Sequence, residues 1–258
     1  MIKAKGNQVY STDLGLRTQD SGLLKHMNQL FFTQKIENGF AYLDEEEGRH
    51  LVTVLRRKPG DRLHLTDGRG YFYEAELTET GKKHAVARIL HTKAADTGYS
   101  TPLHLAIAPT KQIERMEWLL EKATEMGIQA ITLLHCQRSE RDTVRLDRLE
   151  KVLVSAMKQS LRAHLPALHP MTRFSDFVKT AKADLRFIAW CAEQPLPHLK
   201  TQLQTGKSTL VLIGPEGDFS PEEVQLAETA GFTGVSLGAA RLRTETAGLL
   251  AVSAVALA

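Results

Sequence analysis

Two carboxylates, Glu216 and Asp218, occupy the glycine-containing loop GPEGDF (214–219), and their chemistry limits what this loop can bind. An apolar run, Thr209 to Ile213, precedes the loop, and Ser220-Pro221-Glu222-Glu223 after it is a strong helix start. A strand, a glycine turn and a helix N-terminus together present backbone N–H groups to a ligand. Because the loop has no Lys or Arg, it is a poor match for a bare polyphosphate.

A second loop, GAARLR (238–243), leaves the next apolar strand and also leads into a helix. Ligands bind outside the carboxyl ends of the strands in open α/β sheets, so the two loops together predict one site. Each glycine alone is equally well explained as a turn former or as a spacer between helix and strand. Carboxylates with backbone groups suit a ligand that has ribose hydroxyls, an amino group or a positive centre, as S-adenosylmethionine does. The alternative is that both acids face water or complement the dipole of the next helix.

The helix expected over residues 111–126 carries three stripes when it is turned by roughly 100° per residue. The apolar stripe, which we expect in the core, comprises Ile113, Met116, Leu119, Leu120 and Ala123. The second stripe is basic and comprises Lys111, Arg115, Trp118 and Lys122, and the third stripe is acidic. Cations for phosphate and a ring for stacking are what contact with single-stranded RNA requires. The alternative is a solvated face held by i,i+4 ion pairs, with Trp118 half buried.

Basic groups gather in further stretches of the chain. Residues 138–162 hold seven Lys or Arg against four Asp or Glu. Arg56-Arg57-Lys58 and Lys82-Lys83 are local clusters nearer the N-terminus. Each cluster is weak evidence alone, but clusters in both halves suit an anionic partner that spans them. The net charge of +3 permits such a partner without requiring one.

The elements that must hold these loops follow two patterns. Residues 28–93 show short β-prone runs between turn signals, with one helix expected from Glu45 to about Arg56 and Asp44 as its cap. Such close strand spacing suggests a small barrel. After the linker-like stretch 94–102, strands and helices alternate, which predicts a mostly parallel sheet with helices on both faces. The expected strands are 103–108, 128–135, 185–190, 209–213 and 234–237, and the expected helices are 111–126, 146–163, 221–230 and one from about Thr244.

Composition and the two ends of the chain argue against several classes of protein. The chain has 258 residues, of which 42% are hydrophobic and 24% charged, as in ordinary globular proteins. Two distant cysteines, Cys136 and Cys191, make neither a zinc cluster nor a disulfide framework, and they fit a reducing cytosol. The C-terminal apolar stretch has about half of the ~20 residues that span a membrane, so a buried final helix is expected. Residues 1–26 are polar and lack an apolar signal core, and we interpret them as an extension, or as a leader before a start at Met27.

The stretches IGPEGDFSPEEV (213–224) and VSLGAARLRTETA (235–247) together resemble the RsmE family of SPOUT RNA methyltransferases. Further support comes from HLVTVLRRKPGDRLHLTDGRG, KQIERMEWLLEKATEMGI, CQRSE and AMKQSLRA, and the resemblance covers about Met27 to the C-terminus. That family methylates N3 of a uridine in 16S ribosomal RNA near the decoding site, with S-adenosylmethionine as the methyl donor. In that family the loop commonly reads GPEGG, and the second motif often reads LGxRILR. This chain differs from those two patterns at Asp218, Ala240 and Arg241.

The resemblance implies a PUA-like β-barrel domain over residues 27–97 and a SPOUT methyltransferase domain over 98–258, with residues 1–26 outside both. The second domain would be α/β, with a mostly parallel sheet and a C-terminal trefoil knot, against the general rarity of knots. A homodimer with its sites near the subunit interface is also implied. S-adenosylmethionine would lie against Leu212, Ile213, Gly214, Glu216, Gly217, Leu237, Gly238, Leu242, Arg243 and Thr244.

Arg243 and Glu245 are the candidate catalytic residues for methyl transfer to uridine N3. This nitrogen belongs to a weakly acidic imide and must lose its proton to become nucleophilic. A cation near O2 or O4 would stabilise the uridinate, and Arg243 is the first candidate. The base would be Glu245 or water, and the alternative role for Glu245 is to complement the dipole of the last helix. Lys111 and Arg138 would hold phosphates or the target nucleotide, and the full set of candidate RNA-binding residues is Arg56, Arg57, Lys111, Arg115, Lys122, Arg138, Arg141 and Gln159.

Two other classes of function stay open at the level of sequence. A non-catalytic RNA- or ribosome-binding protein on the same fold would need no cofactor pocket. A nucleotide-dependent oxidoreductase on a doubly wound sheet is disfavoured, because the GxGxxG pattern is absent. The expected partners are 16S rRNA or the assembled small ribosomal subunit and a second copy of the chain, in the cytoplasm, without a metal or a membrane.

Overall fold

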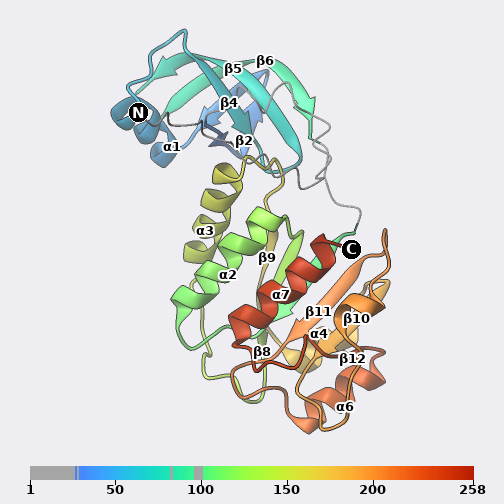
Figure 1. Cartoon of the computed structure of the whole chain (residues 1–258). Coiled ribbons are helices and arrows are strands. Elements are labelled where there is room, and N and C mark those ends of the chain that lie inside the picture. Colours follow the sequence, from blue (N-terminus) through green and yellow to red (C-terminus); the bar gives the residue numbers. More distant parts are fainter. Residues whose placement is uncertain (1–26, 28, 82–83, 96–100) are drawn as a thin grey trace, which may run out of the picture.

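Two six-stranded sheets make up the structure, one in each half of the chain (Figure 1). The computed structural model describes Met27 and residues 29–81, 84–95 and 101–258. The expected extension over 1–26, the Lys82-Lys83 cluster and most of the linker-like stretch lie outside the described residues. A β-rich unit with a curled sheet is therefore followed by an α/β unit with a parallel sheet, which confirms the predicted order.

The first sheet has the order β1-β4-β5-β6-β3-β2 and is antiparallel except between β1 and β4. Register shifts at Glu74/Ala75 and Leu77/Glu79 interrupt the long β5–β6 pair, and such bulges bend a sheet. The bent sheet encloses a small core of its own. The elements of this unit are β1 (Phe31–Phe32), β2 (Lys35–Glu37), β3 (Phe40–Leu43), α1 (Glu45–Arg49), η2 (His50–Val54), β4 (Arg62–Thr66), β5 (Tyr71–Thr80) and β6 (Ala85–Ala94).

Two features of this first unit differ from the sequence expectation. The helix expected over 45–56 does begin at Glu45, where Asp44 Oδ1 accepts from the backbone N of Glu47 at 2.9 Å. It then changes to the π-helical turn η2 and ends at Val54. The hairpin between β2 and β3 was not predicted from the sequence. Its turn residues Asn38 and Gly39 have φ of 51° and 79°, and positive φ values of this kind are typical of two-residue hairpin turns.

The second sheet is parallel throughout, with the order β12-β10-β11-β7-β8-β9. Its strands are β7 (Leu103–Ile107), β8 (Ala130–His135), β9 (Ala167–Arg173), β10 (Leu185–Ala189), β11 (Thr209–Ile213) and β12 (Thr233–Val235). Its helices are α2 (Ile113–Met126), α3 (Leu146–Gln159), α4 (Phe174–Thr180), α5 (Leu199–Gln202), α6 (Pro221–Thr229) and α7 (Thr244–Ala256). One core packs α2, α3 and α7 against the sheet, and a second core packs α4 and α6 against its other face. Helices on both faces of a parallel sheet confirm the predicted fold class.

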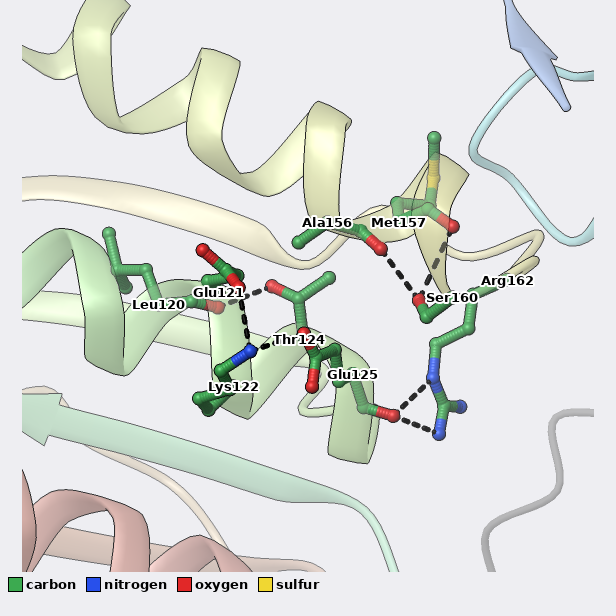
Figure 2. A network of polar contacts seen from close by, with 9 residues as sticks. All are labelled: Leu120, Glu121, Lys122, Thr124, Glu125, Ala156, Met157, Ser160 and Arg162. Atoms are coloured by element: carbon green, nitrogen blue, oxygen red, sulfur yellow. Dashed lines mark hydrogen bonds and ion pairs between the residues drawn. The ribbon is translucent and has the colours of Figure 1, made fainter. Parts of the chain in front are cut away.

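The structure corrects the sequence expectation on both sides of α3. The helix expected over 146–163 ends at Gln159, where the Ser160 hydroxyl donates to the carbonyl of Ala156 at 2.7 Å (Figure 2). Leu161, the next residue, takes a left-handed φ of 53°. β9 and α4 are absent from the expectation. Because β9 is an edge strand with no fully buried residue and an internal proline, its sequence ALHPMTR lacks the usual strand pattern.

Arg162 connects the end of α3 to the end of α2. Its Nε and Nη2 atoms donate to the backbone carbonyl of Glu125 at 2.9 and 2.6 Å (Figure 2). The last carbonyls of a helix need donors from outside the helix, and Arg162 supplies two to one of them. Burial of the guanidinium lowers the pKa of Arg162 from its ordinary value. This cation of the basic stretch 138–162 therefore has a structural contact.

The two units contact each other through backbone and side-chain bonds. Gly70 N donates to Ala163 O at 2.9 Å, and Leu165 N donates to Gly68 O at 2.9 Å. Two ion pairs join α1 to α3: Lys158 pairs with Glu47, whose side chain is 7% exposed, and Lys151 pairs with the exposed Glu46. The end of α3 is thus the main contact of the parallel-sheet unit with the β-rich unit.

Candidate active site

The loops that follow β10, β11 and β12 meet at one edge of the parallel sheet. β10 is the neighbour of both other strands, because Ala189 pairs with Ile213 on one side and with Val235 on the other. The loop after β10 therefore lies between the GPEGDF loop and the loop over 236–243. This edge, at the carboxyl ends of the strands, is where open α/β sheets bind ligands.

The GPEGDF loop is braced by the loops that follow β7 and β8. Glu216 Oε1 accepts from the backbone N of Lys111 at 2.8 Å, and Arg138 Nη1 donates to the carbonyl of Gly217 at 2.8 Å. The helix α6 after the loop begins with the predicted capping box between Ser220 and Glu223. Two residues expected to bind RNA, Lys111 and Arg138, thus lie against the loop expected to bind a cofactor.

Asp218 has an intramolecular role in this loop. Its Oδ2 accepts from the backbone N of Cys191 at 2.9 Å, and its Oδ1 accepts from the backbone N of Phe219 at 2.8 Å. The residue has a left-handed φ of 62°. Both carboxylates of the loop, those of Glu216 and Asp218, therefore accept hydrogen bonds from backbone groups of the protein.

The loop over 236–243 leaves open space beside its backbone. Gly238 has a φ of 120°, and a Cβ placed there would meet no atom within 4 Å. Arg243 is exposed and directly precedes α7, which starts with the buried Thr244. The expected cofactor residues at this sheet edge differ in their exposure to solvent. Leu212, Ile213, Gly214 and Thr244 are buried, Leu237 and Leu242 are half-buried, and Glu216, Gly217, Gly238 and Arg243 are exposed.

A pocket of about 380 Å³ opens between α2 and α7, next to this loop. It is lined by Glu114, Arg115, Trp118, Arg243, Glu245 and Thr246. Glu245 is only 7% exposed, and its Oε1 lies 3.8 Å from Nε of Arg115. Its Oε2 is buried and has no hydrogen-bond partner among the residues that the structure describes. Buried polar atoms are nearly always paired, and this oxygen is an exception.

The expected RNA-binding residues do not form one surface. Arg56 and Arg57 are exposed on the β-rich unit, directly after η2, and Gln159 is exposed at the end of α3. Arg115 lines the pocket, whereas Lys111 and Arg138 contact the GPEGDF loop. Arg141 donates to the carbonyl of Lys111 at 2.6 Å. The structure thus places these residues in at least three separate regions.

Several of these cations are already paired with acidic side chains. Lys122 lies 2.7 Å from Glu121 and 2.8 Å from Glu125 (Figure 2), and these hydrogen bonds raise the pKa of Lys122 above its ordinary value. Lys111 lies 2.7 Å from Glu140, whose hydrogen bond raises the pKa of Lys111 in the same way. Lys122 is therefore ion-paired, although its partners lie one and three residues away and not four, as the alternative for the basic stripe expected.

Sequence reasoning left two parts of the site unassigned. The contact between Asp218 and Cys191 depends on the position of β10 between β11 and β12, which strand order along the chain does not reveal. The pocket depends on the packing of α7 beside α2, which brings Trp118 close to Arg243 and Thr246. In the sequence, Trp118 in the basic stripe of α2 indicated a possible binding surface. It gave no information that α7 packs beside α2.

Comparisons with known proteins fit this geometry. Residues 98–256 match the family described as RNA methyltransferase domain, and residues 43–90 match the RNA methyltransferase PUA domain. The fold and the strand-end site therefore define an RNA methyltransferase with a PUA-like first unit, as the resemblance implied. Ribosomal RNA small subunit methyltransferase E of Mycobacterium bovis is 31% identical over 228 residues, which cover 83% of this chain and 85% of that protein. The chain belongs to the ribosomal RNA small subunit methyltransferase E family, RsmE.

Solved structures resemble the whole arrangement of the two units. A probable rRNA-methyltransferase from Porphyromonas gingivalis is 40% identical, with a TM-score of 0.82 over 87% of this chain and 95% of that one. A putative methyltransferase from Legionella pneumophila, solved with bound SAM, is 28% identical, with a TM-score of 0.80 over 89% and 97%. The family member from Neisseria gonorrhoeae, bound to S-adenosyl methionine, is 30% identical, with a TM-score of 0.76 over 88% and 95%.

Two further observations concern the described residues. No helix among them has both the length and the apolar character needed to cross a bilayer. No group of three or more His, Cys, Asp or Glu side chains in this part of the chain is placed to hold a metal ion.

Proposed function

We propose that this chain uses S-adenosylmethionine to methylate N3 of a uridine in 16S rRNA, in the decoding region of the small ribosomal subunit. The observation that carries the proposal is the pocket at the sheet edge, where the buried Oε2 of Glu245 has no partner among the described residues and Arg243 lies alongside. Relatives of the same family are small subunit rRNA methyltransferases, and two similar structures contain the cofactor.

The strand-end loops fit the cofactor. Open space beside Gly238 allows a ligand to approach the main chain closely. S-adenosylmethionine supplies an activated methyl group when it is bound. The residues that would hold it are Leu212, Ile213, Gly214, Glu216, Gly217, Leu237, Gly238, Leu242, Arg243 and Thr244. Glu216 would act through the fixed shape of its loop, since its carboxylate already binds the backbone N of Lys111.

The pocket between α2 and α7 suits the acceptor base. The N3–H group of uridine is a donor, and the carboxylate of Glu245, which lines the pocket, is the acceptor that would receive its proton. Arg243, on the exposed side of the pocket, would stabilise the negative charge that then develops on O2 or O4. The ring of Trp118 is 43% exposed and offers a stacking surface for the base.

The wider organisation completes the proposal. We propose a PUA-like RNA-binding domain over residues 27–97 and a methyltransferase domain with a C-terminal trefoil knot over 98–258, with residues 1–26 outside both. We propose a cytoplasmic homodimer that acts on 16S rRNA or on the assembled small subunit. Leu250 on α7 supports a dimer, because this apolar side chain is 37% exposed.

A calorimetric titration with S-adenosylmethionine tests the cofactor part of the proposal. We expect one site per chain, and Arg57→Glu is the matched control, because its exposed side chain lies in the other unit. A protein that binds 16S rRNA but takes up no cofactor would be the non-catalytic RNA-binding alternative, and the proposal would then be wrong.

A further inference from the structure

We propose that Asp218 is a positioning residue of the cofactor site, which fastens the loop after β10 to the GPEGDF loop. The inference rests on the proposed function, because it assumes that the cofactor lies at this sheet edge.

The carboxylate of Asp218 joins two segments that are distant in sequence. Oδ2 accepts from the backbone N of Cys191 at 2.9 Å, 27 residues away, and Oδ1 accepts from the backbone N of Phe219 at 2.8 Å. The backbone N of Asp218 donates to the carbonyl of Pro215 at 2.9 Å, which closes a turn within the loop. Each carboxylate oxygen therefore has a defined backbone partner, one in each loop.

One end of this connection is anchored in the core. Phe219 is 3% exposed, and its ring centroid lies 5.2 Å from that of Phe174 on α4. A Cβ at Gly214 would stand 3.2 Å from the Phe219 ring, so this turn has little room to move. The other end, Cys191, is exposed and follows β10 by two residues. The bond from Asp218 thus holds the less constrained loop against the more constrained one.

The backbone conformation of Asp218 argues for a specific role of its side chain. A φ of 62° is left-handed, where glycine has no steric penalty and other residues do. Aspartate tolerates this region better than most residues, because its side chain can bond neighbouring backbone groups. The bond to Phe219 N is such a local bond, whereas the bond to Cys191 N reaches another loop.

The position of Cys191 explains why its hydrogen bond to Asp218 should affect cofactor binding. β10 pairs with β11 and with β12, so residues 190–193 lie between the two loops proposed to hold the cofactor. A shift of this middle loop changes the space between its neighbours. Preorganised loops bind more tightly, because less conformational entropy is lost when the ligand arrives.

Two variants separate the hydrogen bond from the negative charge. Asp218→Gly removes the carboxylate and relieves the left-handed φ, so it folds without new strain. Asp218→Asn removes the charge and tolerates the same φ, and its single amide oxygen can accept from Cys191 N only if Phe219 N loses its side-chain acceptor. Both variants are compared with the wild-type full chain by calorimetric titration with S-adenosylmethionine and by hydrogen exchange of the backbone amides in residues 190–193.

We expect Asp218→Gly to weaken cofactor binding about tenfold, the effect of losing one hydrogen bond to a charged group. Exchange at Cys191 should become several-fold faster, while exchange in the β-rich unit should not change. Asp218→Asn, which can keep the bond to Cys191 N but not both bonds, should lie between the wild type and Asp218→Gly in both measurements. This pattern would not follow from a general loss of stability, which would affect both units.

Wild-type cofactor affinity of Asp218→Gly would overturn the role of Asp218. Unchanged exchange at Cys191 in Asp218→Gly would show that the bond does not hold the loop. A wild-type chain that fails to bind S-adenosylmethionine would instead contradict the proposed function, and that outcome is seen before either variant is measured.

Discussion

Nε of Arg115 lies 3.8 Å from Oε1 of Glu245, so the first and last helices of the parallel-sheet unit meet through an ion pair at the floor of the candidate acceptor pocket. Arg115 binds one oxygen of the carboxylate and leaves the buried Oε2 unpaired among the described residues. A half-paired buried carboxylate is costly unless something else completes it. In this account the uridine base completes it.

Arg243→Ala should lower the methylation rate by about 100-fold or more, because it removes the cation that stabilises the developing uridinate. Arg243 is exposed and its side chain is not needed to cap α7, so the fold should persist. Cofactor affinity, measured by calorimetry, should stay within a few-fold of the wild type, because nine other residues are proposed to hold the cofactor. Near-normal turnover by Arg243→Ala would remove Arg243 from the mechanism.

Glu245→Gln should lower kcat by about 100-fold if the carboxylate takes the N3 proton, the usual size of a general-base effect. Glu114→Gln is the matched control, because Glu114 lines the same pocket but its side chain is 72% exposed. Single-turnover rates with saturating RNA and cofactor separate chemistry from binding. If both variants lower kcat only slightly and to the same extent, water and not Glu245 accepts the N3 proton.

We expect the stability of the protein to depend on pH through Glu47, which lies at the contact between the two units. Burial is the main cause that raises the pKa of Glu47, and its partner Lys158 offsets part of this rise. A carboxyl group with a raised pKa in the folded state contributes stability below its unfolded pKa and loses it as pH rises through the folded pKa. Relative to Glu47→Gln, the wild type should therefore lose on the order of 1 kcal/mol as pH rises from about 4.5.

Glu46→Gln is the control for this prediction, because Glu46 also faces α3, through Lys151, but is 70% exposed. Exposed pairs of this kind contribute little to stability. Chemical denaturation of the three proteins between pH 4 and pH 8 gives the unfolding free energies. A difference between wild type and Glu47→Gln that is flat across this range would contradict the prediction.

Charge reversal at Arg56 and Arg57 should weaken 16S rRNA binding and lower its salt dependence, because both exposed cations are proposed to contact phosphates. Each lost contact should reduce the slope of log affinity against log salt by roughly 0.7 to 0.9. Lys122→Gln should change the slope less, because two carboxylates already pair with Lys122. An unchanged slope for the Arg56→Glu/Arg57→Glu double variant would exclude this part of the β-rich unit from the RNA contact.

Local signals in the sequence predicted most of the parallel-sheet unit. The core stripe of α2, the Gly127 end of that helix and the capping box of α6 are set by residues close in sequence, and the structure confirms all three. The early end of α3 depends on Ser160 and Leu161, whose conformations no periodic pattern shows. β9 was missed because an edge strand needs no apolar run.

The site itself was predictable only as a pair of loops. Their position at strand ends follows from the alternation of strands and helices, but the middle place of β10 is a long-range fact of the sheet order. The sequence also suggested that Glu216 and Asp218 contact a ligand. In the structure, both carboxylates accept hydrogen bonds from backbone N–H groups of the protein. The sequence identified the chemical groups, and the tertiary contacts decide which of them are free to act.

The most direct test of the central claim is mass spectrometry of 16S rRNA from a strain that lacks this chain, with and without the wild-type chain restored. The account predicts that N3-methyluridine in the decoding region is lost on deletion, returns with the wild-type chain, and does not return with Arg243→Ala. Full N3-methyluridine in the deletion strain, or its return with Arg243→Ala, would contradict the account.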